Sequence, residues 1–277
     1  MNCEIEFLPV GEASKAGDAI VVRYGTSTSY ELMVIDAGFD GTGAEIVQHV
    51  REHFPGKRIS HALLTHGDRD HAGGFCTVLN ELEVDNFWLH RPWDVDAAML
   101  AYFADKKLTV DSLLKKIRAE YELLGELVDI AESNGISMRA PFASEMVGPF
   151  QVLSPSREGY RLLVPQFDRT PAPDEAALKA AGLWIGKAPQ GLGRVISSIK
   201  ELVAETAHKF FTESWTAERL KDDGTVTSAT NESSVVLYGE CDAGPALLTG
   251  DAGVHALTMA ADFADEIGLP LGQFKCV

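Results

Sequence analysis

The chain has 277 residues, of which 45% are hydrophobic and 23% are charged. This composition is typical of a folded globular protein, and no apolar run is long enough to cross a membrane. The formal net charge of −17 disfavours long nucleic acid as a ligand, because binding along a phosphate backbone draws on Lys and Arg. We therefore expect a small or short anionic substrate, although a local basic groove can exist on an acidic surface.

The start of the chain lacks the basic segment and apolar stretch of a secretion signal, so we expect a cytoplasmic protein with no membrane partner. The four cysteines, Cys3, Cys76, Cys241 and Cys276, show no CxxC spacing. Unpaired thiols are therefore favoured over a disulfide framework. The sequence leaves the oligomeric state open.

Three strands are predicted at the start of the chain, at residues 3–10, 19–24 and 30–35. Asp36 follows the third strand, where its carboxylate can cap the turn or orient a ligand histidine. A helix is predicted over residues 42–54 and a buried strand over residues 59–64.

Four side chains capable of binding metal follow that strand within six residues: His66, Asp68, Asp70 and His71. Apolar residues at helical spacing come next, so the four lie on a strand-to-helix loop and can converge on one point. Imidazole with carboxylate suits zinc, and a carboxylate-rich set also suits manganese or iron. Burying four such groups without a cation would cost several kcal/mol, which favours a metal site. The alternative is that the four form a solvated polar turn.

The middle of the chain is predicted to be mainly helical. His90 ends a short strand at residues 86–90 and is a candidate ligand or substrate contact, although a lone histidine is more often structural. Helical insertions are expected at about residues 94–135 and 156–225, the second with helices at 175–181 and 192–220. Acidic and basic residues are equal in number in the second insertion, whereas the whole chain is strongly acidic. If an anionic substrate is bound, this insertion is therefore the best wall for it. The favoured interpretation is a solvated charged helix face.

The last part of the chain returns to strands, at residues 232–238 and 245–248, with Asp251 directly after the second. A carboxylate at this place can bridge two cations about 3.5–4 Å apart. A helix is predicted over residues 253–267, and a last strand begins at residue 272.

These motifs resemble those of a known superfamily. Residues 65–71 read Thr-His-Gly-Asp-Arg-Asp-His, which is similar to the Thr-His-x-His-x-Asp-His signature of the metallo-β-lactamases, with Asp68 in place of the second histidine. That variant resembles the soluble hydrolase domain of the competence-protein family ComEC/Rec2. Further matching segments are Gly17-Asp18-Ala19, Asp36-Ala37-Gly38, Asn231-Glu232-Ser233-Ser234 and Thr249-Gly250-Asp251. The resemblance covers about residues 1–90 and 226–277 and leaves out the middle of the chain.

The resemblance implies an α/β fold, an αββα sandwich of two mixed β-sheets in a single domain over residues 1–277. It implies one or two divalent ions, zinc or manganese, held by five ligands: His66, Asp68, Asp70, His71 and Asp251. Asp70 would also orient the attacking hydroxide and is the predicted catalytic residue. Asp36, His90 and Asn231 are predicted to contact substrate or to orient the ligands.

The implied activity is hydrolysis by a metal-activated water, with a phosphodiester as the favoured substrate. A lactam, lactone or thioester is the alternative substrate, because the same scaffold supports these reactions. A metal-poor binding protein is a further alternative, since the superfamily's third-motif histidine is missing from the middle of the chain. In the resembled family the last strand leads into His-His-Gly-Ser, and we expect a truncated chain rather than a degenerate site or a ligand from a neighbouring subunit.

Overall fold

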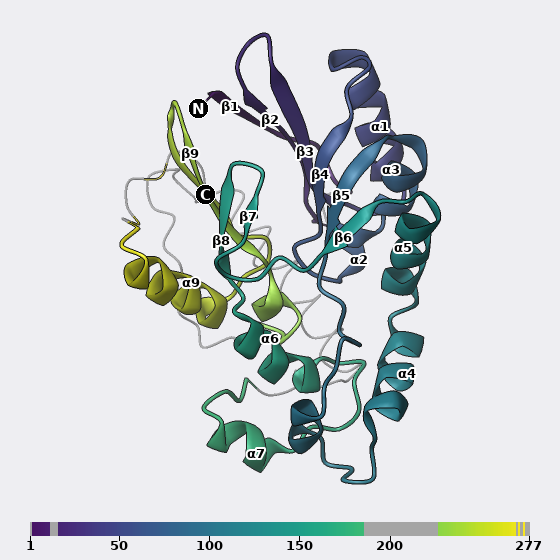
Figure 1. Ribbon diagram of the computed structural model, residues 1–277, viewed down its shortest axis with the longest axis vertical. Coiled ribbons are helices and arrows are strands. Elements are labelled where there is room, and N and C mark those ends of the chain that lie inside the picture. The colour runs from purple at the N-terminus through teal and green to yellow at the C-terminus, as the bar shows by residue number, and fades with distance from the viewer. Residues whose placement is uncertain (1, 12–15, 186–226, 270, 272–273, 275–277) are drawn as a thin grey trace, which may run out of the picture.

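Two β-sheets lie face to face in the computed structural model, and helices cover both outer faces (Figure 1). The structure describes residues 2–11, 16–185, 227–269, 271 and 274. The first sheet has the order β1-β2-β3-β4-β5-β6, in which β1, β2 and β3 are antiparallel and β3 to β6 are parallel. Its strands are β1 (Asn2–Phe7), β2 (Ala19–Gly25), β3 (Tyr30–Ala37), β4 (Ile59–Leu63), β5 (Val84–Trp88) and β6 (Ser137–Arg139).

The second sheet has the order β10-β9-β8-β7, and its described strands are all antiparallel. They are β7 (Met146–Val147), β8 (Phe150–Ser154), β9 (Val236–Cys241) and β10 (Gly244–Leu248). Together with the helices, the two sheets confirm the predicted αββα arrangement.

The alternation of side chains along each strand explains why the layers stack. In β3, Met33 and Ile35 point into the core between the sheets, and Leu32 and Val34 point toward the helices. All four are fully buried. A strand buried on both faces is a continuous apolar run, which is how this segment reads in the sequence.

Helices α1 (Thr42–His53), α3 (Phe75–Glu81) and α5 (Glu122–Ser133) cover the outer face of the first sheet, and α9 (Val254–Glu266) covers the second (Figure 1). Helix α9 packs through small residues, Ala260 and Ala264, against Val236 and Tyr238 of β9. The close approach that alanine permits holds the loop before α9 against the second sheet.

The first insertion contains η1 (Ala98–Tyr102), α4 (Val110–Glu120) and α5, and the second contains α6 (Arg157–Leu163), η2 (Val164–Gln166) and α7 (Glu175–Ala180). Thr109 begins α4 with a capping box to Ser112. Tyr121 lies between α4 and α5, and its backbone is not helical, so the helix is interrupted at this residue. The helix predicted at 192–220 lies outside the described residues, as does most of the strand predicted from residue 272.

Several predicted bounds differ from the structure. The strand predicted at 3–10 is β1, which ends at Phe7, and the strand predicted at 86–90 is β5, which ends at Trp88, so His90 lies beyond it. The strand predicted from residue 232 begins only at Val236, because Asn231–Ser233 forms a 3₁₀ turn (η3) whose first backbone N–H donates to Ser228 Oγ. Helix α6 was not predicted, and the Ser156 side chain caps it by accepting from Gly159 N. Within the described part of the chain, none of the helices combines the length and apolar character that a membrane span requires.

Candidate metal centre

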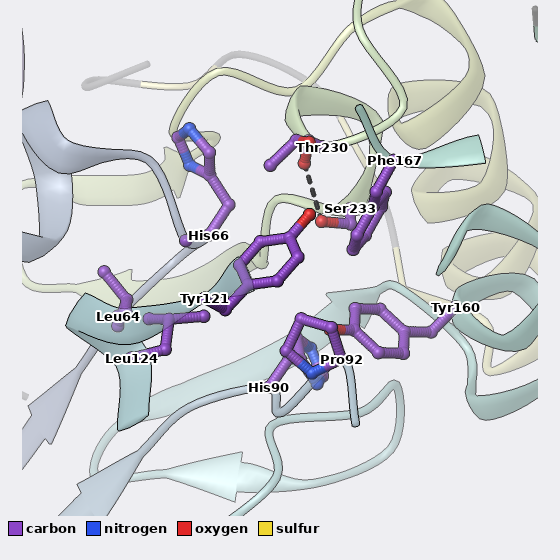
Figure 2. A pocket seen from close by; sticks show the side chains of 11 residues that line it. Leu64, His66, His90, Pro92, Tyr121, Leu124, Tyr160, Phe167, Thr230 and Ser233 are labelled. Carbon is purple, nitrogen blue, oxygen red and sulfur yellow. Dashed lines mark hydrogen bonds between the residues drawn. The ribbon is translucent and has the colours of Figure 1, made fainter. Parts of the chain in front are cut away.

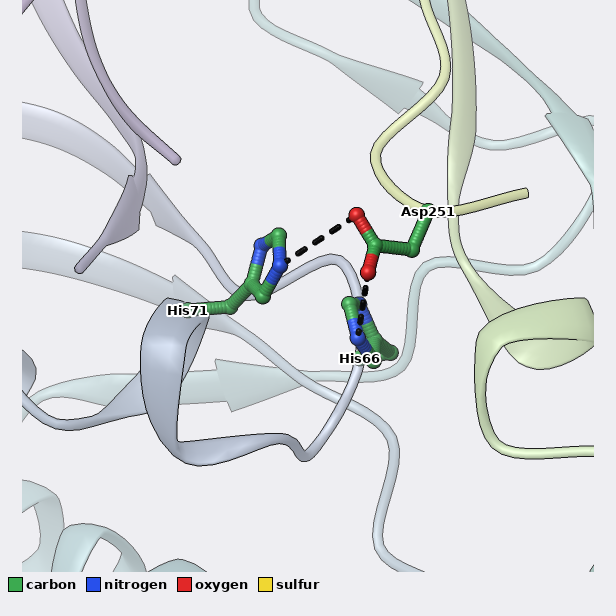
Figure 3. A group of neighbouring side chains, drawn as sticks. All are labelled: His66, His71 and Asp251. Atoms are coloured by element: carbon green, nitrogen blue, oxygen red, sulfur yellow. Dashed lines mark ion pairs between the residues drawn. The ribbon is translucent and has the colours of Figure 1, made fainter. Parts of the chain in front are cut away.

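Three segments far apart in the sequence meet where the first sheet's parallel strands end (Figure 3). Asp36 lies at the end of β3, and His66 lies in the loop that follows β4. The short helix α2 (Arg69–Ala72) carries His71, and Asp251 comes from the loop after β10 in the second sheet. The carboxyl ends of parallel strands are the usual place for ligands in α/β sheets.

His66, His71 and Asp251 point toward one another and form a group that could hold a cation (Figure 3). The Asp251 carboxylate faces both rings, with Oδ1 3.4 Å from His71 Nε2 and Oδ2 3.9 Å from His66 Nε2. Ligands of a tetrahedral zinc at about 2.0–2.2 Å lie roughly 3.3–3.6 Å apart, close to these distances. His66 Nε2 is buried and has no hydrogen-bond partner among the described residues. A cation would supply the missing partner, so the residues fit a metal ion.

Asp36 sets the tautomers of both histidines from below the group. Its Oδ2 accepts from Thr65 Oγ1 at 2.6 Å and pairs with His71 Nδ1 at 2.8 Å, so in the neutral, ligating form of His71 the lone pair is on Nε2. Because Thr65 gives its only hydroxyl proton to Asp36, it accepts from His66 Nδ1, 3.1 Å away. His66 therefore also presents a lone pair on Nε2. One buried carboxylate thus turns two imidazoles into ligands aimed at the same point.

Asp251 is positioned by the glycine that precedes it and by a hydrogen bond from Asn231. Gly250 before it has φ 49°, and a Cβ at that position would lie 2.9 Å from Thr65 Oγ1, so glycine lets this loop pass close to the ligand loop. Asn231 Nδ2 donates to Asp251 Oδ2 at 3.3 Å, and Ser228 Oγ donates to Asn231 Oδ1. Asn231 thus contacts one of the predicted ligands, and its orienting role stays a prediction.

The charges of the group favour a cation at its centre. Burial works to lower the pKa of His71, but hydrogen bonds to Asp251 and Asp36 outweigh it and raise that pKa to about 11. The hydrogen bond to His71 lowers the pKa of Asp251, whereas burial and the neighbouring His71 lower the pKa of His66. Without metal, the protonated ring of His71 lies between the carboxylates of Asp36 and Asp251. A divalent cation can replace the proton on Nε2.

Asp68 and Asp70 lie beside this group rather than in it. Asp68 Oδ2 is 3.7 Å from His66 Nε2, and its side chain is about half exposed; burial and the charge of Asp70 raise its pKa, opposed by the His66 charge. Asp70 begins α2 with its neighbour Arg69 and lines the cleft described below. Neither belongs to the tight group, so their predicted ligand roles stay predictions.

Asp18 is a site residue that the sequence analysis missed. It forms a second acidic group with Asp36 and His71, and burial followed by the charge of Asp36 raises its pKa. The only sequence signal was its place in the Gly-Asp-Ala segment, where it read as part of a strand. Because His71 Nδ1 is already bonded to Asp36, Asp18 adds negative charge behind the histidine.

His90 does not join the ligands. Its ring stacks on Tyr160 with centroids 4.4 Å apart and contacts Phe142 at 4.6 Å, and neither ring nitrogen has a hydrogen-bond partner among the described residues. Burial, with Arg157 nearby, lowers its pKa to about 3, so it is neutral. His90 and His66 line the same small cavity (Figure 2), together with Leu64, Gly67, Pro92, Tyr121, Leu124, Tyr160, Phe167, Thr230 and Ser233. That arrangement gives His90 a place in the wall behind the site.

A larger cleft of about 380 Å³ opens on the other side of Tyr121, and we call it the outer cleft. It is lined by Gly67, Asp68, Arg69, Asp70, Tyr121, Leu123, Leu124, Asp168, Arg169, Ser228 and Thr230. The metal-binding loop, the junction of α4 and α5, and the second insertion each form part of its wall. Its volume falls within the range of small-molecule sites.

One family model matches the part of the chain that contains the ligand loop. The family model of the metallo-beta-lactamase superfamily matches residues 16–91, which span β2 to β5 and include His66 and His71. A "putative metallo-beta-lactamase" from Thermotoga maritima aligns at 12% identity and a TM-score of 0.40, covering 97% of this chain and 93% of that chain. A beta-lactamase domain protein from Burkholderia ambifaria aligns at 17% identity and a TM-score of 0.31, covering 55% of this chain and 47% of that one. A search of curated proteins found no match.

Proposed function

We propose that this chain is a metal-dependent hydrolase of the metallo-beta-lactamase superfamily. The observation that carries the proposal is the convergence of His66, His71 and Asp251, with an unpartnered and buried His66 Nε2 facing the carboxylate. The family match over residues 16–91 supports the same assignment. A metal-poor binding protein fits less well, because it would leave that nitrogen buried without a partner.

When bound, the cation would supply Lewis acidity and a water whose pKa lies nearer neutrality. His66, His71 and Asp251 would hold it, and Asp36 and Thr65 would keep both imidazoles in the ligating tautomer. We propose that Asp70, at the start of α2 and on the wall of the outer cleft, orients the attacking water and accepts its proton. The carboxylates near the centre favour a hard cation, so manganese is a candidate beside zinc.

A phosphodiester is the substrate class that we propose. The finer resemblance to the competence-protein domain points to phosphodiesters, and the net charge of −17 favours a short one. The outer cleft has room for a small molecule rather than a duplex. A lactam, lactone or thioester remains the competing class and is decided by assay.

Metal content and hydrolysis test the proposal together. We expect the purified chain to take up close to one equivalent of zinc or manganese, or two, and to hydrolyse bis-p-nitrophenyl phosphate faster than nitrocefin. Asp251→Asn should lose both metal and activity, whereas Asp262→Asn on the exposed face of α9 should keep both. Less than about a tenth of an equivalent of metal in the wild-type chain would refute the hydrolase assignment.

A further inference from the structure

We propose that Arg169 binds a second phosphate of the substrate, one beyond the phosphodiester that is cleaved. The inference rests on the proposed function and names the substrate more closely, as a short phosphodiester that also carries a terminal phosphate. Arg169 lies in the loop after η2, within the second insertion that the sequence offers as a wall for an anionic substrate.

Arg169 shares the outer cleft with the ligand loop. The lining of this cleft includes Asp68 and Asp70 of the ligand loop together with Asp168 and Arg169 of the second insertion. Its volume of about 380 Å³ is enough for a small molecule to contact both the ligand loop and the guanidinium. A substrate with two anionic groups can therefore place one at each end.

The guanidinium of Arg169 is exposed and available. The other arginine of the cleft, Arg69, is paired with Asp40, whereas Arg169 has no ion pair among the described residues. It lies over the ring of Tyr121, with its central carbon 5.9 Å from the ring centroid. Tyr121 is buried and stands at the junction of α4 and α5, so it is a rigid support for the arginine. Stacking on an aromatic ring leaves the planar fork of N–H donors free to meet an anion.

The charge of the cleft explains why a second phosphate needs such a partner. Three carboxylates, Asp68, Asp70 and Asp168, line the cleft and would repel an anion. A cation at the metal centre offsets Asp68 and Asp70, which leaves Asp168 beside Arg169 at the far end. The fork of the guanidinium matches phosphate with two parallel hydrogen bonds, the strongest arrangement that a single side chain offers.

Two dinucleotides separate this role from general affinity. Thymidylyl-thymidine (TpT) carries only the internal phosphodiester, and its 5′-phosphorylated form (pTpT) adds one terminal phosphate. We expect the wild-type chain to bind and cleave pTpT roughly five- to tenfold better than TpT, mainly through KM, as a charge-assisted contact in a half-open cleft allows. Arg169→Gln should remove that preference, so that pTpT and TpT are bound and cleaved about equally.

Arg139→Gln is the matched control. Arg139 is also exposed, also lies over an aromatic ring, that of Trp88 at 5.5 Å, and also has no ion pair among the described residues. It should keep the wild-type preference for pTpT. A wild-type chain without the preference, or an unchanged preference in Arg169→Gln, would overturn the inference.

Equilibrium binding distinguishes failure of this inference from failure of the proposed function. Calorimetry of the metal-loaded chain with pTpT and TpT reports the terminal phosphate even when neither is cleaved. Cleavage of neither dinucleotide, with binding of pTpT that depends on Arg169, would sink the phosphodiesterase assignment and support the phosphate site. Cleavage of both with equal binding would do the reverse. A wild-type chain that binds neither overturns the inference.

Discussion

Asp36→Asn is the substitution that tests the centre most directly. Asparagine has nearly the shape of aspartate and also tolerates the positive φ of 53° at this position, so the backbone need not change. The substitution removes one acceptor oxygen and the charge, and it replaces that oxygen with an N–H₂ group.

The expected loss follows from the contacts of Asp36. Its Oδ1 accepts from Thr65 N at 2.7 Å, a bond that the asparagine oxygen can keep. Its Oδ2 serves Thr65 Oγ1 at 2.6 Å and His71 Nδ1 at 2.8 Å, and an N–H₂ group in its place cannot accept a proton from either, so both charge-assisted bonds are lost. Hydrogen bonds to charged groups contribute about 1.5–3 kcal/mol each, so the metal-free chain should lose about 3 kcal/mol or more of unfolding free energy.

Metal affinity should fall as well. Beside an N–H₂ group, His71 is favoured with its lone pair on Nδ1 and its proton on Nε2, and it then presents no ligand to a cation. Loss of such an orienting partner typically weakens metal binding about 10–100-fold. Competition with a chromophoric zinc chelator measures the affinity, and urea unfolding measures the stability. Asp40→Asn is the control, because Asp40 is an exposed carboxylate whose ion-pair partner among the described residues is Arg69. A folded Asp36→Asn chain that binds zinc as tightly as wild type would refute the account of the two tautomers.

Three further predictions concern the surroundings of the centre. Burial lowers the pKa of His90 to about 3, below its unfolded value near 6.5, so its contribution to stability is present above pH 6.5 and is lost as the pH falls toward 3. His90→Phe should therefore lessen the loss of unfolding free energy between pH 7 and pH 5 by about 2 kcal/mol in urea titrations, and an unchanged pH slope would contradict this. Gly74→Ala should destabilise the chain by about 2–3 kcal/mol, because its Cβ would overlap backbone atoms, whereas Gly41→Ala has open space and should be nearly neutral in thermal unfolding. Glu232→Ala should cost about 1–2 kcal/mol in urea unfolding, since its buried carboxylate accepts from Ala256 N in the first turn of α9; an effect no larger than that of Glu232→Gln would count against this cap.

The sequence alone determined the parts of the site that are local. His66 and His71 follow one buried strand within six residues, so their meeting depends on a single loop, and the structure places their ring centroids 4.2 Å apart. The strands of the first sheet and α1 were predictable for the same reason, since apolar alternation and helical spacing are read within a few residues. The motif resemblance added Asp251, and its carboxylate does lie beside both histidines.

Only the tertiary structure decided which distant residues complete the site. Tyr121 read as one member of an apolar helical stripe, yet the break between α4 and α5 places it between the inner cavity and the outer cleft. Arg169 was one charged residue among many in the second insertion, and His90 was a ligand candidate. Packing put the first in the cleft and the second against Tyr160 and Phe142. Periodicity says which face of a segment is buried, but not what it is buried against. That is set by how the two sheets and the insertions close around the strand ends, and no local pattern encodes it.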